Sequence, residues 1–343
     1  MKLVKKITQR FQMAYQAFRF GEIRSESGLE LRSLTKEEIL EIKSFFPRPK
    51  YFIFGHARSG TTLLARLLRV HPKVHCNWQT HFFTREPFLE DLVAPPEIRA
   101  WFSQHSNRWI GGEDFSPLAV RVVGDFMLER EAQKLGKNVV GDKSPNTKLN
   151  GEAVRKMQRI YPEGKLIYIV RDGRDAAISH RFLNFIDFPE FLSEEDLEIR
   201  EAFAEDPRSF FKGQRSIFSA GQLQEAAENW VKNVEETHAL GQKLFGERYF
   251  SLRYEDLVDQ PFEMICRAWK FLEVDCTFTD LQDRIREQLN RNPDASWQKK
   301  QAEEIVDKLK KGKAGSWKEL FPQKDKDIFQ KVAGETLQDW GYL

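Results

Sequence analysis

The chain is poor in cysteine. Its 343 residues contain three, Cys76, Cys266 and Cys276, with no CxxC pair and an odd total. This cysteine content favours a reducing compartment. We therefore expect neither a disulfide framework nor a cysteine-based zinc site. We therefore expect a cytoplasmic protein.

Long apolar runs and a strong net charge are also missing. No run of about twenty apolar residues occurs, so we expect no transmembrane segment, and the N-terminus lacks the apolar core of a signal peptide. The formal net charge is only +2, so a nucleic-acid partner is not expected and any anion site has to be local. The 28 Phe and 8 Trp residues can supply a large core and aromatic pocket walls.

Residues 1–48 are expected to form a helical arm. Apolar residues occur at helical spacing among basic ones in "MKLVKKITQRFQMAYQAFRF". This helix has two possible partners, an anionic membrane surface or a docking surface on this protein or a second subunit. A second helix follows in "SLTKEEILEIKSFF", where Thr35 and Glu38 form a capping box.

Residues 49–343 are expected to form one α/β domain. Short apolar runs alternate with helical segments, as in "YFIFG", "NVVGDKSP", "KLIYIVRDG" and "RYFSLRYEDL". The alternation predicts a P-loop-like three-layer α/β/α fold, with a central parallel sheet and helices on both faces. Ligands of such sheets bind beyond the carboxyl ends of the strands. The loops led by Gly55, Asp142, Arg171 and Tyr254 are therefore expected to face one cleft.

The strand–helix pattern lapses in residues 185–221. The acidic "LSEEDLEIREAFAED" is followed there by "PRSFFKGQRSIFSAG". We interpret this segment as an insertion with its own small helices. It is either a lid or acceptor-binding element or a solvated decoration.

The stretch "GHARSGTTLL" has the outline of a phosphate loop without its lysine. Gly55 and Gly60 have the GxxxxGK[ST] spacing, but Thr61 takes the lysine position and Thr62 the hydroxyl position. The main-chain N–H groups of such a loop bind an anion whatever its side chains are. A nucleotide hydrolase needs the missing lysine and a Mg²⁺ ion. A sulfuryl group carries less charge than a terminal phosphoryl group, so Arg58 and other fixed donors can serve its transfer without a metal.

Four motifs carry a family resemblance. "ARSGTTLL" resembles the 5′-phosphosulfate loop of sulfotransferases that use 3′-phosphoadenosine 5′-phosphosulfate (PAPS), and the similarity covers most of the chain after residue 50. "VRDGRDAAISH" resembles the family's 3′-phosphate motif, which implies roles for Arg171 and Ser179. "RYEDL" resembles the segment whose tyrosine, here Tyr254, lies near the adenine. Alternatively, Arg171 is an ordinary ion-pair partner of Asp172 or Asp175.

The two halves of the chain resemble different branches of the family. The first half is closer to the tyrosyl-protein sulfotransferases, whereas "KKGKAGSWKELF" and "ASWQKK" resemble segments of the cytosolic branch. The alternative interpretation of the lysine-rich "KKGK" is a solvated turn. The resemblance implies binding of PAPS, and of its product 3′-phosphoadenosine 5′-phosphate (PAP), by Arg58, Ser59, Gly60, Thr61, Thr62, Arg171, Ser179, Tyr254, Ser296, Trp297, Lys310, Lys311 and Gly312.

Catalysis in such an enzyme consists of positioning, stabilising the leaving oxygen and removing the acceptor's proton. Arg58 and the Thr62 hydroxyl are expected to hold the transferring group. Lys143 is the second cation that the resemblance implies, assigned to the sulfonyl or bridging oxygen. Its alternative is a lysine at an exposed strand end.

The general base is harder to assign. The tyrosyl-protein branch has a glutamate where this chain has Gln79, and the cytosolic branch has a histidine where it has Pro145. His81 is the nearest side chain with a suitable pKa, although it can also be structural. Asp142 is the second candidate. The catalytic prediction is thus Arg58, Lys143 and His81.

No metal site is expected. His71 and His75 have the spacing of helical metal ligands, but Pro72 opposes a helix there, and no carboxylate or cysteine set completes the site.

Two alternatives to a sulfotransferase stay open. One is a P-loop kinase or nucleotide hydrolase with an altered loop. The other is a non-catalytic scaffold that binds PAP. The sequence leaves the acceptor open among small molecules, glycans and peptides, and leaves the oligomeric state open as well.

Overall fold

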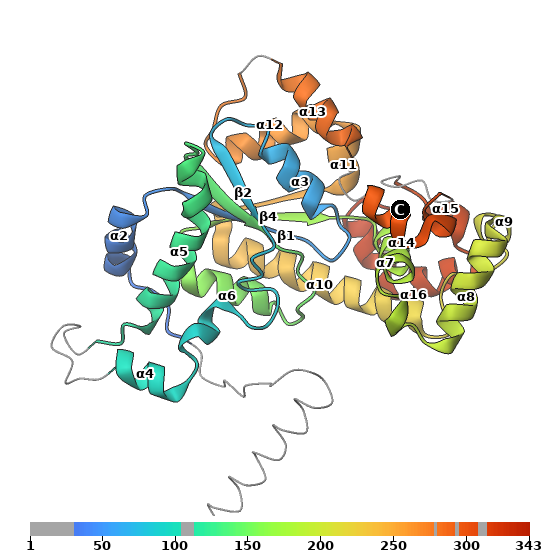
Figure 1. The fold of residues 1–343 in the computed structure, drawn as a ribbon, viewed down its shortest axis with the longest axis horizontal. Helices are drawn as coiled ribbons and strands as arrows, with labels where there is room; N and C mark the ends of the chain where they lie inside the picture. Colours follow the sequence, from blue (N-terminus) through green and yellow to red (C-terminus); the bar gives the residue numbers. More distant parts are fainter. Residues whose placement is uncertain (1–30, 104–112, 278–279, 292–294, 308–313) are drawn as a thin grey trace, which may run out of the picture.

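The computed structural model describes residues 31–103, 113–277, 280–291, 295–307 and 314–343 (Figure 1). The expected basic helix in residues 1–20 lies outside this range, as do Lys310, Lys311 and Gly312. Ser296 and Trp297 lie on a described helix, but their side chains are not described.

The centre of the fold is a five-stranded sheet with the order β2-β3-β1-β4-β5. All four neighbouring pairs are parallel, which confirms the predicted parallel sheet. The strands are β1 Lys50–Phe54, β2 Val74–Trp78, β3 Val139–Lys143, β4 Lys165–Val170 and β5 Tyr249–Arg253. β2 has no counterpart among the strands expected from the sequence.

One face of the sheet is covered by the helices drawn above it in Figure 1. Side chains of β1 alternate between the two faces, and Tyr51 and Ile53 point to this one, where they join a buried apolar cluster. The cluster also contains residues of α3 Thr61–Leu68, α11 Tyr254–Asp259, α12 Pro261–Phe271 and α13 Leu281–Asn290.

The opposite face holds the larger core. Phe52 and Phe54 of β1 point into it, together with Leu166 and Tyr168 of β4. Its helices are α5 Ser116–Lys134, α6 Glu152–Ile160, α7 Gly173–Asp187, α10 Gln222–Phe245, α14 Ala295–Val306, α15 Trp317–Leu320 and α16 Gln323–Asp339. Helices on both faces complete the predicted three-layer arrangement.

The N-terminal arm is described from Leu31 onward. Its helix α2, Lys36–Phe45, begins with the predicted capping box, in which Thr35 accepts from the Glu38 main-chain N–H and Glu38 accepts from that of Thr35. Leu34 and Ile42 pack against Leu118 at the start of α5. Beyond α2, the connection from β2 to α5 contains the short helices η1 Leu89–Val93 and α4 Pro96–Phe102.

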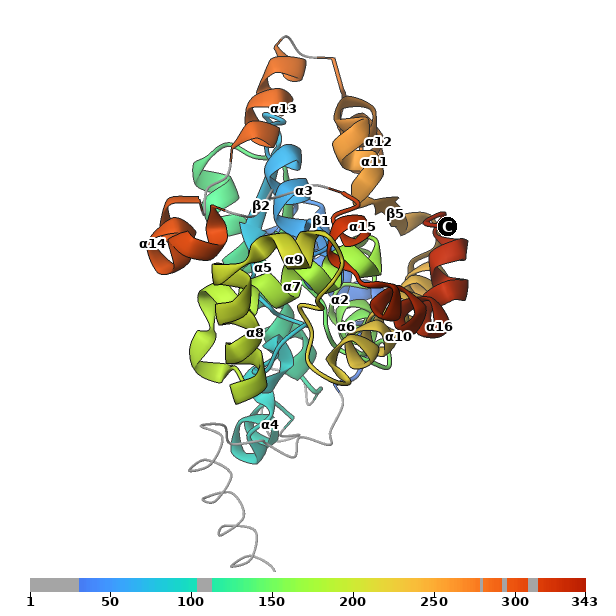
Figure 2. The ribbon, with the colours of Figure 1, turned by 90° about the vertical axis from the view of Figure 1, so that its right-hand side faces the viewer.

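The segment 185–221 contains η3 Pro189–Phe191, α8 Glu194–Glu205 and α9 Pro207–Phe211. Phe203, Phe210 and Ile217 are fully buried and belong to the larger core. α8 contacts α14, and α9 contacts α15, so these four helices gather in front of the molecule in Figure 2. The segment is thus packed rather than solvated, and its role at an acceptor stays a prediction.

The cysteine expectation is wrong in one respect. Cys266 of α12 and Cys276 form a disulfide, with their Cα atoms 5.6 Å apart. The expectation relied on the missing CxxC pair and the odd number of cysteines. Neither feature prevents two of the three cysteines from forming a disulfide. The bond forms because α12 ends at Phe271, so the chain turns back and brings the second cysteine beside the first. Cys76 is free and buried. No helix in the described residues has the length and apolarity that crossing a bilayer requires.

Candidate functional site

The loop after β1 turns sharply into α3. Arg58 and Gly60 adopt left-handed φ angles of 70° and 90°. Gly60 is the N-cap of α3, and no described side chain caps the helix. The first main-chain N–H groups of α3 therefore keep their capacity to bind an anion, which the helix dipole favours.

Gly60 also has to be a glycine because of its neighbour. A Cβ atom added there would lie 2.3 Å from Cδ2 of Tyr254, the first residue of α11 after β5. The Tyr254 ring in turn lies under the Arg171 guanidinium, whose Cζ is 4.7 Å from the ring centroid. The loops that follow β1, β4 and β5 thus meet at one place, as expected from the strand ends.

Arg58, Arg171 and Ser179 form one contact chain. Arg171 Nη1 donates to the Arg58 carbonyl oxygen at 3.1 Å, and Arg58 Nε donates to Ser179 Oγ at 3.1 Å. The indole N–H of Trp230 donates to the Arg171 carbonyl oxygen at 3.2 Å and so holds the end of β4. The lysine-free loop and the start of α7 are therefore side by side, which places two cations within one site.

Lys143 approaches the same loop from the end of β3. Its Nζ donates to Thr62 Oγ1 at 3.0 Å and lies 5.4 Å from the centroid of the Trp78 ring. The residue is only 2% exposed. It is therefore not a lysine at an exposed strand end, and its charge is directed at the first turn of α3.

The loop fits an anionic group by a further criterion. Ser59 is 1% exposed, and its Oγ has no hydrogen-bond partner among the described residues. A buried hydroxyl without a partner is costly. Together with the uncapped helix and the nearby cations, it fits the anionic end of a nucleotide donor.

The loop after β2 carries the two residues at issue for the general base. Gln79 N–H donates to the Lys143 carbonyl oxygen at 2.7 Å, which extends the pairing of β2 with β3. Asp142 is 2% exposed and both its oxygens already accept, Oδ1 from the Thr80 N–H and Oδ2 from Ser144 Oγ. Burial raises the pKa of Asp142. Its contacts are those of a loop anchor rather than of a base open to an acceptor.

His81 is partly buried at the start of this loop, and its Nδ1 lies 2.8 Å from Thr84 Oγ1. Partial burial lowers the pKa of His81, and the charges of Arg85 and Lys143 lower it further. The imidazole is therefore neutral at pH 7, the state that a general base requires.

The C-terminal segment reaches α7 just beyond the undescribed lysines. Asp175 accepts from the main-chain N–H groups of Gly315 at 2.6 Å and Trp317 at 3.0 Å. The Arg174 guanidinium lies 3.7 Å from the centroid of the Trp317 ring. Helix α14, which carries Ser296 and Trp297, packs against α7 as well. Both C-terminal motifs therefore lead to the helix that carries Ser179.

Two histidines near the loop were missed in the sequence. His56 follows Gly55, and its Nδ1–H donates to the Ala57 carbonyl oxygen at 3.2 Å. Burial, with a smaller effect of His180, lowers the pKa of His56 to about 4. Desolvation and the charge of Arg58 lower the pKa of His180, the residue after Ser179. Their only sequence signal is their place directly beside two motif residues.

His71 and His75 serve the fold. No helix runs through them, because α3 ends at Leu68 and β2 begins at Val74. His71 Nδ1 accepts from the Lys73 N–H, and Nε2 donates to the Asp275 carbonyl oxygen at 2.9 Å. His75 is buried on β2.

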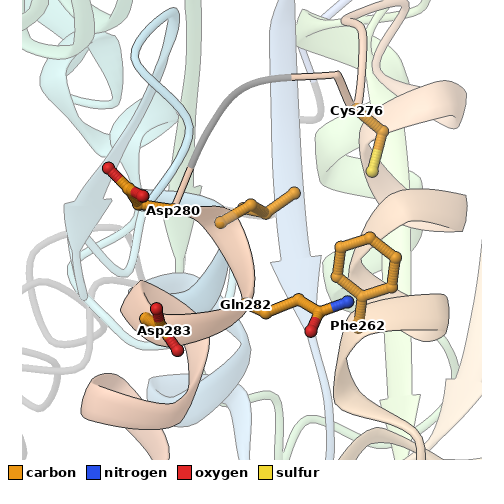
Figure 3. A pocket seen from close by; sticks show the side chains of 6 residues that line it. Phe262, Cys276, Asp280, Gln282 and Asp283 are labelled. Atoms are coloured by element: carbon orange, nitrogen blue, oxygen red, sulfur yellow. The ribbon is translucent and has the colours of Figure 1, made fainter.

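A hollow in the surface lies elsewhere, between α12 and α13 (Figure 3). Its lining comprises Phe262, Cys276, Asp280, Leu281, Gln282 and Asp283. None of these residues belongs to the loops after β1, β3 or β4. The hollow adjoins the disulfide and is separate from the charged site.

Comparison with known proteins decides the family. The model of the sulfotransferase domain matches residues 48–341. The chain belongs to the sulfotransferase family. It is 25% identical over 228 residues to a protein-tyrosine sulfotransferase of Drosophila melanogaster, which covers 66% of this chain and 38% of the relative. The chain thus spans well under half of that relative's length.

Solved sulfotransferase structures are also similar to the chain. Mouse sulfotransferase SULT7A1, complexed with PAP, matches with a TM-score of 0.46 and 17% identity, covering 89% of this chain and 90% of its own. The sulfotransferase domain from the curacin biosynthetic pathway matches with a TM-score of 0.49 and 18% identity, covering 84% and 97%. Membership of the family accounts for the lysine-free loop.

Proposed function

We propose that this protein transfers the sulfuryl group of PAPS to a hydroxyl or amine acceptor. The observation that carries the proposal is the contact chain from Arg171 through the Arg58 carbonyl group, and from Arg58 to Ser179. It joins a lysine-free phosphate loop to a second cationic position. A donor that bears a phosphosulfate and a separate 3′-phosphate needs both.

The residues that would hold the donor come from three loops. The N–H groups at the start of α3, the Ser59 hydroxyl and Arg58 suit the phosphosulfate. Arg171 and Ser179 suit the 3′-phosphate, and Tyr254 suits the adenine. Ser296, Trp297, Lys310, Lys311 and Gly312 remain proposed donor contacts on the resemblance alone.

PAPS supplies the sulfuryl group and a good leaving group, and the protein's own side chains supply the rest. Lys143 and Arg58 stabilise the charge on the oxygens around sulfur, which is the largest contribution expected of fixed donors. His81, neutral at pH 7, accepts the proton of the acceptor as its oxygen or nitrogen attacks sulfur. The bond from sulfur to the bridging oxygen breaks, and PAP leaves.

The two alternative functions have less support. A kinase or nucleotide hydrolase needs a lysine on the β/γ-phosphates, and the buried Lys143 approaches the loop from β3 instead. The family match favours transfer over both.

The test is calorimetry with PAP, with and without Mg²⁺, beside ATP. We expect PAP to bind tightly without the metal and ATP to bind far more weakly. Turnover of PAPS is then measured by mass spectrometry against phenols, alcohols, amines, glycans and tyrosine peptides. Mg²⁺-dependent ATP turnover would support the kinase, and tight PAP binding with no transfer to any acceptor would support the scaffold.

The acceptor, the partners and the location can be proposed only by class. The acceptor is a small molecule, a glycan or a peptide. Its contacts should be sought first among residues 185–221. We also propose peripheral membrane contact through the basic residues 1–20, which binding to anionic vesicles tests. The cytoplasmic location stays a prediction, and the Cys266–Cys276 bond, which is typical of oxidising compartments, opposes it.

A further inference from the structure

The main chain of the loop after β2 has a conformation that residues other than glycine rarely adopt. Gln79 and His81 have φ angles of 50° and 54°, both in the left-handed region, although neither is glycine. Such conformations persist only where the surroundings fix them, and they cluster at functional sites. The contacts that fix this loop therefore indicate what it has to position.

Two buried side chains hold the main chain of the loop. Ser144 Oγ accepts from the His81 N–H at 3.0 Å and donates to Asp142 Oδ2 at 2.6 Å. Asp142 Oδ1 accepts from the Thr80 N–H at 3.1 Å. Asp142 and Ser144 are each 2% exposed, so these bonds are shielded from water. The two residues flank Lys143, which binds Thr62 from the same strand end.

A third side chain holds the imidazole ring. Thr84 is 4% exposed, and its Oγ1 lies 2.8 Å from His81 Nδ1. The ring has two neutral tautomers, and the partner of one nitrogen decides which of them forms. If Nδ1–H donates to Thr84, then Nε2 keeps its lone pair and can accept a proton.

We propose that Ser144 and Thr84 are positioning residues for His81 in the transfer reaction. Ser144, backed by Asp142, sets the place of the main chain beside Lys143. Thr84 holds the Nδ1–H tautomer and leaves Nε2 for the acceptor's proton. The same strand end thereby fixes both the cation at sulfur and the base. This inference rests on the proposed function and adds to it an assignment that the family motifs do not supply.

The charges around His81 agree with this role. Burial disfavours the charged form of the ring, and so do the charges of Arg85 and Lys143. Asp142 is close, but both its oxygens are occupied by Thr80 and Ser144. His81 is therefore a neutral base rather than half of an ion pair.

The first test reads the tautomer by nitrogen NMR of the unliganded full-length protein. We expect the Nδ1–H form of His81 in the wild type. Thr84→Val should move the ring toward the Nε2–H form, and Thr84→Ser should restore the wild-type spectrum. A wild-type His81 in the Nε2–H form, or a spectrum unchanged by Thr84→Val, would overturn the role of Thr84. This readout does not depend on activity.

The second test is kinetic. Ser144→Ala should lower kcat at least about tenfold, because a small displacement of a base is costly, and should leave the Kd for PAP unchanged. Ser144→Thr, which keeps the hydroxyl, should recover most of the loss. A wild-type kcat in Ser144→Ala would overturn the role of Ser144. Absence of transfer by the wild type would instead refute the proposed function.

Ser216 offers a matched control. Its Oγ donates to Asp325 Oδ2 at 2.6 Å and accepts from the Phe218 N–H at 3.0 Å, the same pattern as at Ser144. Ser216→Ala should lose similar thermal stability while kcat and the His81 spectrum stay unchanged. If Ser216→Ala lowered kcat as much as Ser144→Ala does, the effect would be one of stability alone and the positioning role would fail.

Discussion

The two ends of the central sheet treat buried lysines differently. At the amino end of β1, Lys50 Nζ lies 2.7 Å from Glu129 Oε1 and 3.4 Å from Asp125 Oδ1. At the carboxyl end of the neighbouring β3, Lys143 Nζ meets the Thr62 hydroxyl and an aromatic ring. The first lysine is neutralised by α5, whereas the second is directed at a loop that suits an anion. Burial alone therefore does not tell these two lysines apart; the chemistry of their neighbours does.

The amino end is completed by arginines. Arg48 pairs with Glu129 at 2.6 Å, and Arg121 pairs with Asp125 at 2.9 Å and with Glu163 at 2.6 Å. This network joins the arm, α5 and the approach to β4. It contributes to the fold without any ligand. At the carboxyl end, by contrast, we expect mutations to affect ligand binding more than stability.

The largest effect is expected from Lys50→Met. Removing one partner leaves Asp125 and Glu129 without part of their counter-charge, and should lower the free energy of unfolding by about 3–5 kcal/mol. Urea denaturation measures this, with PAP calorimetry on the folded variant as the control. Lys143→Met should show the reverse, a small stability change with loss of transfer. Equal behaviour of the two variants would erase the distinction between the ends.

Arg171→Ala and Arg58→Ala should weaken PAP binding by roughly 2–4 kcal/mol each, because a partly buried phosphate loses a charged partner. Calorimetry measures the loss. Arg286→Ala, which removes an exposed arginine paired with Asp283 on α13, is the matched control and should bind PAP normally. Unchanged affinity in both site variants would place the nucleotide elsewhere.

Cys266→Ala should lower the free energy of unfolding by roughly 2–3 kcal/mol, since the bond closes a short loop, and make the variant insensitive to reductant. PAP affinity should change little, because the disulfide lies on α12, away from the loop after β1. Thermal unfolding with and without dithiothreitol is the measurement. A wild-type protein whose unfolding ignores reductant would show that the bond is absent.

The smallest effect concerns His56. The folded protein holds its pKa at about 4, below the ordinary value of 6.5, so the unfolded chain binds a proton first as the pH falls. The contribution to stability is therefore complete above pH 6.5 and is lost between that value and about pH 4. His56→Gln should flatten this part of the curve of unfolding free energy against pH. An unaltered slope would mean that His56 is exposed to solvent.

Much of the fold could be predicted because apolar runs mark buried parallel strands. β1, β3, β4 and β5 were all expected, and so was the capping box at Thr35. β2 was not, because histidine, cysteine and asparagine interrupt its short sequence. The disulfide was missed for a different reason, since two cysteines ten residues apart approach each other only through the turn after α12.

The site shows the same division. Strand-end logic and the family motifs brought Arg58, Lys143, Arg171 and Tyr254 to one place, as the structure has them. The anchoring of His81 by Ser144 depends on the register of β2 against β3, where Trp78 pairs with Lys143, and no local pattern reveals a register. The assignment of these site residues to catalysis and binding stays a prediction until the variants are measured.

The position of the Tyr254 ring would couple the two ends of the proposed nucleotide site. Its ring contacts both Gly60, where the loop enters α3, and Arg171 at the end of β4. A displacement of the ring by one phosphate group would therefore be felt by the other, and the two halves of the donor would bind cooperatively. An adenosine compound with both groups should then bind more tightly than the sum of the two separate contributions suggests.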